Sequence, residues 1–336
     1  MTIIYAILIF CVLIFVHEFG HFITAKACGI KVNEFAIGMG PAFFKKQWGE
    51  TQYSLRIFPI GGFCAMEGED EDSEDPRAFN NQPAWQRAIV LAAGSLMNLL
   101  TCVVLLIIIA LYVGQATTTL DSIEPNSPAE AAGLKAGDQI VMIDGKKVEE
   151  WSEVIEDIGY TKEKTAEITV LRDGEELTLT TELKYDKEQK RNMIGITPVG
   201  EHHFLPSVVE GIKNTGSMTV LMYDTLRQLF TGDVSVKELS GPVGIVYAVN
   251  MTAKSGVIYV IYLAALLSLN LAIINMLPFP ALDGGRLLFL LIRKITGKRV
   301  TDEMEGRIHF IGIMLLFALM IYVTFNDVIR FVVPIF

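Results

Sequence analysis

The sequence "FVHEFGH", from Phe15 to His21, closes an apolar stretch that begins near Ile3. A helix of roughly 20 apolar residues is long enough to cross a lipid bilayer. An ionisable side chain at the centre of a membrane costs on the order of 3 kcal/mol, so such residues usually carry a function. The motif therefore predicts a membrane-spanning helix that contains a polar site.

The composition of the whole chain agrees with a membrane protein. Its 336 residues are 51% hydrophobic and 20% charged, with a mean hydropathy of +0.41, which is too apolar for an ordinary soluble protein. Four segments are long and apolar enough to span a bilayer: about Ile3–Thr24, Ala88–Val113, Val257–Leu277 and Ile308–Val323. We therefore expect a polytopic α-helical membrane protein with four transmembrane helices.

A cleaved signal peptide is the alternative interpretation of the first segment, because Ala25–Ala27 resembles a signal-peptidase site. Two observations oppose cleavage. No positive charge precedes the apolar stretch, and three ionisable residues interrupt its end. The segment is therefore expected to stay in the protein as a helix.

Basic residues set the expected orientation, since Lys and Arg near membrane ends favour the cytoplasmic side. They gather after the first span and between the last two spans. They are Lys26, Lys31, Lys45, Lys46, Arg56, Arg77 and Arg87, and then Arg286, Arg293, Lys294, Lys298, Arg299 and Arg307. Both segments should face the cytoplasm, with the middle region and both termini extracytoplasmic. The acidic run Glu67–Pro76 weighs little in this rule.

The net charge argues against a nucleic-acid-binding protein, and the positions of the cysteines argue against disulfides. The net charge of −10 argues against a nucleic-acid partner, because nucleic-acid surfaces need clustered Lys and Arg. Cys11 and Cys102 lie in spans, and Cys28 and Cys64 lie in the expected cytoplasmic segment. No disulfide is expected in the extracytoplasmic region.

The opening motif has the spacing of a zinc site. His17 and His21 are four residues apart and lie on the same face of a helix, where their imidazoles can bind one ion. Glu18 lies beside them and can act as general base toward a water that zinc acidifies. The same pattern also occurs by chance on solvated helices, but an apolar span favours a functional site.

A hydrolytic zinc needs a third protein ligand, and "NMLPFPALDGGR", residues 275 to 286, offers one. Pro278 and Pro280 break the third span, and Gly284–Gly285 should allow a tight turn. Asp283 would emerge at this break, at a depth similar to that of the two histidines. The alternative is that this cluster only ends a helix.

Taken together, these motifs resemble the site-2 protease family of intramembrane zinc metalloproteases, and within it the bacterial regulator of sigma-E protease group. The resemblance covers nearly the whole chain. It rests on "HEFGH", on "GSLMN" (Gly94–Asn98), on "SGPVGI" (Ser240–Ile245) and on "NMLPFPALDGG". It implies Zn²⁺ as cofactor, His17, His21 and Asp283 as its ligands, and Glu18 as the catalytic base.

The resemblance also implies two substrate-binding asparagines. Asn275 would lie near the substrate backbone, and Asn98 matches a second-span position linked to the active-site region. For Asn98 the alternative is helix packing beside Gly94. Members of the family often have histidine where this chain has Arg286, which we expect to act as a cytoplasmic anchor.

The middle region, about Thr117–Lys184, is similar to one PDZ domain, a module that binds extended peptides along a sheet edge. A Gly-Leu-Gly-Phe type carboxylate loop is not obvious there, so a steric filter against bulky ectodomains stays open as its role. In residues 185–256 the apolar spacing predicts an amphipathic helix, either on the membrane surface or packed on the protein.

The cytoplasmic segment 27–87 shows strand-like alternation over Thr51–Phe63. Together with Glu34–Pro41 it predicts a membrane-associated β-hairpin whose edge strand pairs with an unwound substrate. The alternative is an ordinary loop hairpin.

The expected architecture is thus four transmembrane helices with a membrane-associated β-hairpin region and an inserted α+β PDZ domain. The expected segments are 1–26, 27–87, 88–113, 117–184, 185–256, 257–286, 287–307 (cytoplasmic loop) and 308–336 (fourth helix and tail).

The expected function is zinc-dependent hydrolysis of peptide bonds within transmembrane segments, in a bacterial plasma membrane. The resemblance implies single-span substrates, either anti-sigma factors or remnant signal peptides, with membrane lipid as the surroundings. Two alternatives are a non-catalytic PDZ-bearing scaffold and a transporter, although inverted hydropathy repeats are not evident.

Overall fold

The computed structural model describes residues 2–69, 71–187, 189–235, 238–297 and 302–332. The chain forms two compact units, and each is described by itself. One unit comprises Met1–Ile109 and Gly211–Phe336, and the other comprises Ala110–Glu210. The acidic position 70 and the basic positions 298 and 299 lie outside the described residues, as do 333–336 of the fourth segment.

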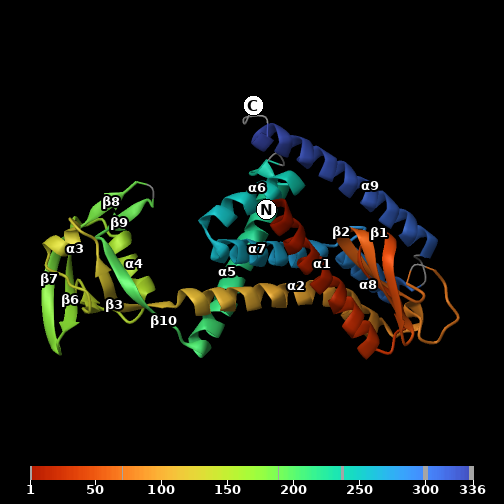
Figure 1. Ribbon diagram of the computed structural model, residues 1–336, viewed down its shortest axis with the longest axis horizontal. Coiled ribbons are helices and arrows are strands. Elements are labelled where there is room, and N and C mark those ends of the chain that lie inside the picture. Colours follow the sequence, from red (N-terminus) through yellow and green to blue (C-terminus); the bar gives the residue numbers. More distant parts are fainter. Residues whose placement is uncertain (1, 70, 188, 236–237, 298–301, 333–336) are drawn as a thin grey trace. The chain divides into compact units, whose positions relative to one another are not determined.

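The first unit contains most of the helices and a small sheet (Figure 1). In chain order its elements are α1 (Thr2–Ala27), β1 (Val32–Trp48), β2 (Thr51–Met66), the 3-10 turn η1 (Phe79–Asn81), α2 (Ala84–Val113), α5 (Phe204–Thr231), α6 (Pro242–Ser255), α7 (Val257–Asn275), α8 (Asp283–Thr296), α9 (Asp302–Asp327) and the π-helical turn η3 (Val328–Val332). The ends of α2 and α5 continue into the second unit.

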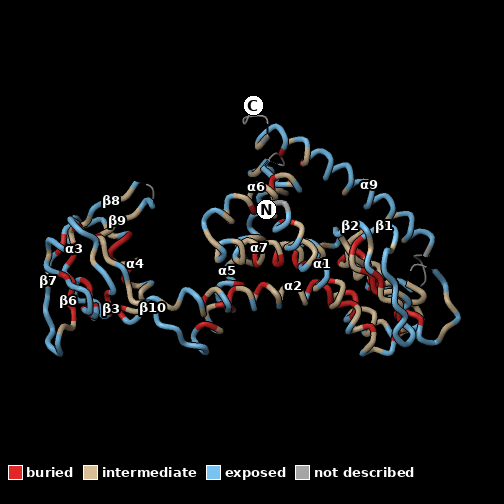
Figure 2. Tube along the Cα trace, viewed as in Figure 1, coloured by how far each residue is buried: buried red, intermediate tan, exposed pale blue. Residues whose placement is uncertain are grey.

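Among the described residues, four helices are long and apolar enough to cross a membrane: α1, α2, α7 and α9. They correspond to the four segments expected from the sequence. Side chains of α9 are exposed along most of its length (Figure 2), which suits a helix that faces lipid. The chain is therefore a membrane protein with four candidate spans.

Two boundaries differ from the expected ones. The third span ends at Asn275, and a separate helix, α8, begins at Asp283, because Pro278 and Pro280 interrupt the backbone hydrogen bonds between them. Most of the predicted loop 287–307 is consequently helical. In α8 the apolar and basic residues recur at helical spacing, and the prediction of a loop missed this pattern.

The small sheet of β1 and β2 packs against α1, and its strands pair more than once. Glu34–Ile37 pairs with Gln52–Leu55 on one side and with Gly62–Ala65 on the other. Phe44–Trp48 also pairs with the 51–55 segment. The 51–55 segment therefore lies inside the sheet, and among the described strands the 62–65 segment has a neighbour on one side only.

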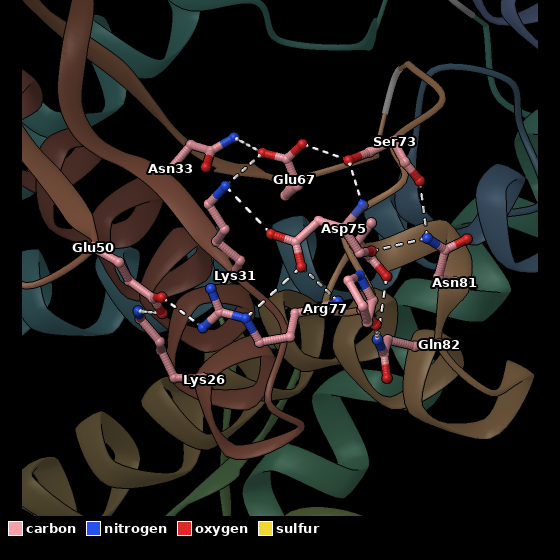
Figure 3. Close-up of polar contacts among 12 residues, drawn as sticks. Lys26, Lys31, Asn33, Glu50, Glu67, Ser73, Asp75, Arg77, Asn81 and Gln82 are labelled. Carbon is pink, nitrogen blue, oxygen red and sulfur yellow. Dashed lines mark hydrogen bonds and ion pairs between the residues drawn. The ribbon is translucent and has the colours of Figure 1, made fainter.

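A polar network ties the segment after β2 to the end of α1 (Figure 3). Ser73 and Asn33 donate hydrogen bonds to Glu67, and Lys31 pairs with it at 3.2 Å; these contacts lower the pKa of Glu67 to about 2. Lys31 also lies 3.5 Å from Asp75. Part of the acidic run is thus neutralised by nearby cations.

Two helices occupy the region predicted as a linker with one amphipathic helix. Over its part in the first unit, α5 packs Met218, Met222 and Leu226 against a cluster that contains Cys102 and Leu269. Its other face is exposed, including Val220, Leu221 and Tyr223. One face of this amphipathic helix therefore packs on the protein, and contact of the other face with the membrane surface stays a prediction.

The second unit is an α+β fold built on a sheet with strand order β10-β3-β4-β6-β7. Its elements are β3 (Gln115–Ile123), α3 (Pro128–Ala131), β4 (Gln139–Ile143), β5 (Lys146–Lys147), α4 (Trp151–Gly159), β6 (Thr165–Arg172), β7 (Glu175–Glu182), β8 (Lys184–Asp186), β9 (Arg191–Met193) and β10 (Ile196–Glu201). Asp173 and Gly174 form the turn of a β-hairpin, since both residues have positive φ and β6 pairs with β7. The unit extends past the expected end at Lys184, because β10 pairs with β3.

One buried ion pair fixes the β4 and β6 ends of this sheet. The side chain of Asp138 is 1% exposed and accepts hydrogen bonds from Arg172 at 2.6 and 2.7 Å and from the Lys135 N–H at 2.8 Å. Burial alone would raise the pKa of Asp138, but these partners outweigh it, and the pKa lies below its usual value. The resulting stabilisation is lost when the pH falls below the usual aspartate pKa.

We expect Arg172→Ala to lower the free energy of unfolding of the second unit by about 3 kcal/mol, because it leaves the Asp138 carboxylate buried without its cation. Hydrogen exchange of β4 and β6 in the full-length protein in detergent measures the change. Lys147→Ala is the control, since the Lys147–Glu149 pair is exposed on both sides. Equal exchange rates in the two variants would contradict the assignment.

Candidate metal centre

Three side chains from two helices converge at one point in the first unit. His17 and His21 project from α1, and Asp283 is the first residue of α8. His17 Nε2 and His21 Nε2 are 3.3 Å apart, and Asp283 Oδ2 lies 3.2 Å and 3.4 Å from them. Both histidines are buried and the aspartate side chain is 21% exposed.

The spacing of these three atoms suits a tetrahedral ion. Zinc bonds to nitrogen and oxygen are about 2.0–2.1 Å long, so tetrahedral donors lie roughly 3.3–3.4 Å apart. The three observed separations fall within about 0.2 Å of that spacing. Among the described residues this is the one cluster of three or more His, Cys, Asp or Glu side chains with metal-ligand spacing. The residues present therefore fit zinc.

Space for an ion is kept open by α2. A Cβ atom built at Gly94 would lie 2.3 Å from His21 Nε2 and 2.7 Å from His17 Cε1. Any side chain at this position would occupy the volume that faces the donor atoms. The glycine of "GSLMN" is thus explained by the site next to it.

The backbone of α2 also orients one ligand. His21 Nδ1 donates to the Val90 carbonyl oxygen at 2.8 Å, which leaves Nε2 as the nitrogen with a free lone pair. Sequence reasoning missed Val90, because a backbone carbonyl carries no signal in the residue type.

Asn98 reaches the other histidine and is fully buried. Its Nδ2 lies 3.3 Å from His17 Nδ1, and its backbone carbonyl accepts from Ser268 of α7 at 2.7 Å. Its Oδ1 has no hydrogen-bond partner among the described residues. If the Asn98 carboxamide is turned by about 180°, its Oδ1 accepts a hydrogen bond from the Nδ1–H of His17. This contact fixes the His17 tautomer that binds metal through Nε2. Its burial suits an orienting role for His17 rather than contact with substrate.

Asn275 lies at the end of α7 and is partly exposed. Its Nδ2 is 3.4 Å from His17 Nε2, so its carboxamide borders the cluster. This position leaves donors available for a group that approaches the ligands.

Glu18 lies next to the cluster, and no described residue donates a hydrogen bond to its side chain. Strand β2 passes close to it, since a Cβ built at Gly62 would lie 3.5 Å from Glu18 Cγ. The 62–65 edge of the sheet therefore runs beside the carboxylate that the sequence singles out as a base.

The expectation that Gly284 and Gly285 form a tight turn is wrong. Both lie in the first turn of α8, where Cβ atoms would be 2.3 Å from the Met276 carbonyl oxygen and 2.2 Å from that of Phe279. They allow α8 to press against the loop before it. The left-handed residue of this loop is Ala281, with φ +80°.

Two more residues of this region bear on the sequence-based interpretation. Arg286, expected to act as a cytoplasmic anchor, forms an ion pair with Glu69 in the segment after β2. His309 lies in α9 and is not part of a motif with regular spacing. An ionisable residue inside an apolar span nevertheless indicates a function, and the sequence analysis missed it.

Comparison with known proteins gives matches along nearly the whole chain. The profile of Peptidase family M50 matches residues 5–319. A Clostridium acetobutylicum relative, provisionally named a zinc metalloprotease, is 41% identical over 334 residues, covering 98% of this chain and 97% of that one. The regulator of sigma-W protease RasP of Bacillus subtilis is 32% identical over 416 residues, with 98% of each chain covered. A crystal structure of a PDZ domain from an SdrC-like protein of Listeria innocua is 28% identical over 26% of this chain and 99% of that one, with a TM-score of 0.23.

We expect Gly94→Ala to lower zinc affinity by about tenfold or more, because its methyl group would displace the two imidazoles. Metal content of the purified protein after titration with a chelator measures the loss. Ser95→Ala on the same turn is the control, since no residue within the described ranges forms a hydrogen bond with its buried hydroxyl. Full zinc retention in Gly94→Ala would show that the site has room for a side chain.

Proposed function

The chain belongs to peptidase family M50 and is a zinc metalloprotease, and from this premise we propose that it hydrolyses peptide bonds inside the transmembrane segments of single-span membrane proteins. One observation carries the proposal. The two histidines of the cluster belong to a helix that is long and apolar enough to cross a membrane. A soluble protein substrate has no access to such a depth, whereas a transmembrane segment lies there already.

The geometry of the cluster supports a set of catalytic roles. His17, His21 and Asp283 would hold the zinc ion, which supplies Lewis acidity toward water and the scissile carbonyl. Glu18 takes the proton of the attacking water and returns it to the leaving amine nitrogen. The Asn275 carboxamide donates to the substrate backbone, and Asn98 orients His17 from behind.

The sheet offers a way to present the substrate. A helix hides its backbone, so the scissile carbonyl must leave the helix before it can react. An extended substrate segment can pair with the 62–65 edge of β2, which has β1 on its other side and passes Glu18. The substrate would therefore pair with the end of the predicted Thr51–Phe63 strand, because the 51–55 part already has a neighbour on both sides.

Orientation and substrate class complete the proposal. The basic segments after α1 and between α7 and α9 face the cytoplasm, which leaves the second unit and both termini extracytoplasmic. The Bacillus subtilis relative is named a regulator of sigma-W protease, which supports anti-sigma factors as substrates here. Remnant signal peptides have the same single-span chemistry and remain in the proposed class.

The second unit supplies a further contact surface. A groove lies between α4 and the β9–β10 segment, lined by apolar side chains that include Trp151, Ile155 and Met193. Such a groove suits an extended peptide, and with the strand order of the unit it supports a PDZ-type role in recruiting substrate rather than only filtering it by size.

We expect Glu18→Gln to abolish cleavage of a transmembrane reporter while zinc stays bound, because the carboxylate moves a proton and holds no metal. Asp283→Ala should lose both zinc and activity, since it removes one of three ligands. Zinc content and reporter cleavage in one proteoliposome preparation measure both. Loss of zinc in Glu18→Gln, or full zinc in Asp283→Ala, would contradict the division of roles.

We expect cleavage to depend on the helical stability of the substrate. Each Ala→Gly change near the scissile bond weakens the helix by about 1 kcal/mol, so two changes should raise the initial rate by up to about 30-fold. A Leu-rich replacement should lower it. The control is a substrate with the same changes near the other end of its transmembrane helix, far from the scissile bond. Equal rates for all of these substrates would contradict unwinding as a step.

A further inference from the structure

A histidine of the fourth span holds the loop that leads into Asp283. His309 lies in α9, and its Nδ1 accepts a hydrogen bond from the Ala281 N–H at 2.8 Å. Its side chain is 14% exposed. Ala281 is two residues before Asp283, so the contact acts on the backbone that places this carboxylate.

The loop needs this support because its backbone is unusual. Ala281 has φ +80°, in the left-handed region that residues with a Cβ rarely adopt. Phe279 and Leu282 form their N–H hydrogen bonds within the loop, to Leu277 and Phe279. The Ala281 N–H instead finds its acceptor on another helix, so the strained turn is held from outside.

A second contact from α9 lies one turn further along the same face. A Cβ built at Gly312 would be 2.5 Å from the Pro280 carbonyl oxygen and 2.6 Å from Pro280 Cβ. The helix therefore touches the loop backbone directly at Gly312 and through a side chain at His309. Residues three apart on a helix project from the same face, as these two contacts require.

The tautomer of His309 is fixed by the Ala281 N–H. Because Nδ1 accepts a hydrogen bond, it carries no proton, and Nε2 of the neutral ring carries one. Nε2 lies 3.6 Å from Glu305 Oε1, and Glu305 pairs with Arg293 of α8. The ring of Phe289, also in α8, packs 5.5 Å from the His309 ring. Contacts from α8 thus orient the ring that holds the loop.

We propose that His309 is a positioning residue that fixes the Pro280–Asp283 turn and thereby places the Asp283 carboxylate against His17 and His21. The proposal rests on the proposed role of Asp283 as a zinc ligand. It gives the fourth span a part in building the metal centre, although α9 contributes no ligand itself.

A matched pair of variants tests the hydrogen bond. Asparagine and leucine have similar shapes, but asparagine carries an acceptor oxygen close to the position of the histidine Nδ1. We expect His309→Leu to raise the rate of zinc loss to a chelator by tenfold or more and to lower kcat with little change in KM. His309→Asn should stay within about threefold of the unchanged protein. Phe310→Leu, at a side chain that is 61% exposed, is the control for substitution in α9.

Hydrogen exchange in the zinc-free protein supplies a readout that does not involve activity. The Ala281 amide should exchange at least tenfold faster in His309→Leu than in His309→Asn. The proposal would be overturned if His309→Leu and His309→Asn had equal rates of zinc loss and equal rates of amide exchange. This holds whether both variants behave like the unchanged protein or both are impaired to the same extent. Asp283→Ala separates the ligand hypothesis from the positioning hypothesis. Full zinc content in Asp283→Ala refutes the role of Asp283 as a ligand. Zinc loss in Asp283→Ala together with an unaffected His309→Leu refutes only the positioning role of His309.

Discussion

The convergence of His17, His21 and Asp283 on one point within an apolar helix assembly is the constraint on which the rest of the first unit depends. Ionisable groups at such a depth are costly unless they satisfy one another or a bound ion. Gly94 on α2 leaves room for the two imidazoles, and Gly284 and Gly285 let α8 approach the loop before Asp283. These three glycines thus allow the three side chains to meet.

A second requirement follows from the break between α7 and α8. Irregular backbone at membrane depth must find its hydrogen bonds within the protein. The loop from Met276 to Leu282 does so through carbonyls of α7, through its own carbonyls and through His309. The fourth span, exposed over most of its surface, therefore contributes to the site by satisfying backbone that the prolines leave open.

Much of the site could be predicted from the sequence, because its main signals are local. The four-residue spacing of His17 and His21 fixes their common face within a single helix, and the prolines before Asp283 mark the break from which it emerges. The left-handed backbone of Ala281 had no such signal, since alanine is not typical of that conformation.

Long-range pairing was the other part that the sequence did not reveal. Alternation over Thr51–Phe63 predicts a strand but not its neighbours, and the structure places its first half inside the sheet. In the second unit, β10 contains Pro198 and Gly200, which are poor strand signals, and only its pairing with β3 shows that it belongs to the sheet.

That pairing places the first and last strands of the second unit side by side. The chain therefore enters and leaves this unit at neighbouring positions, as domains that tolerate insertion into another protein do. Evolution can exchange such a module for another, duplicate it or remove it while the two flanking helices keep their separation. The second unit can then diversify among species without any change at the cluster of His17, His21 and Asp283.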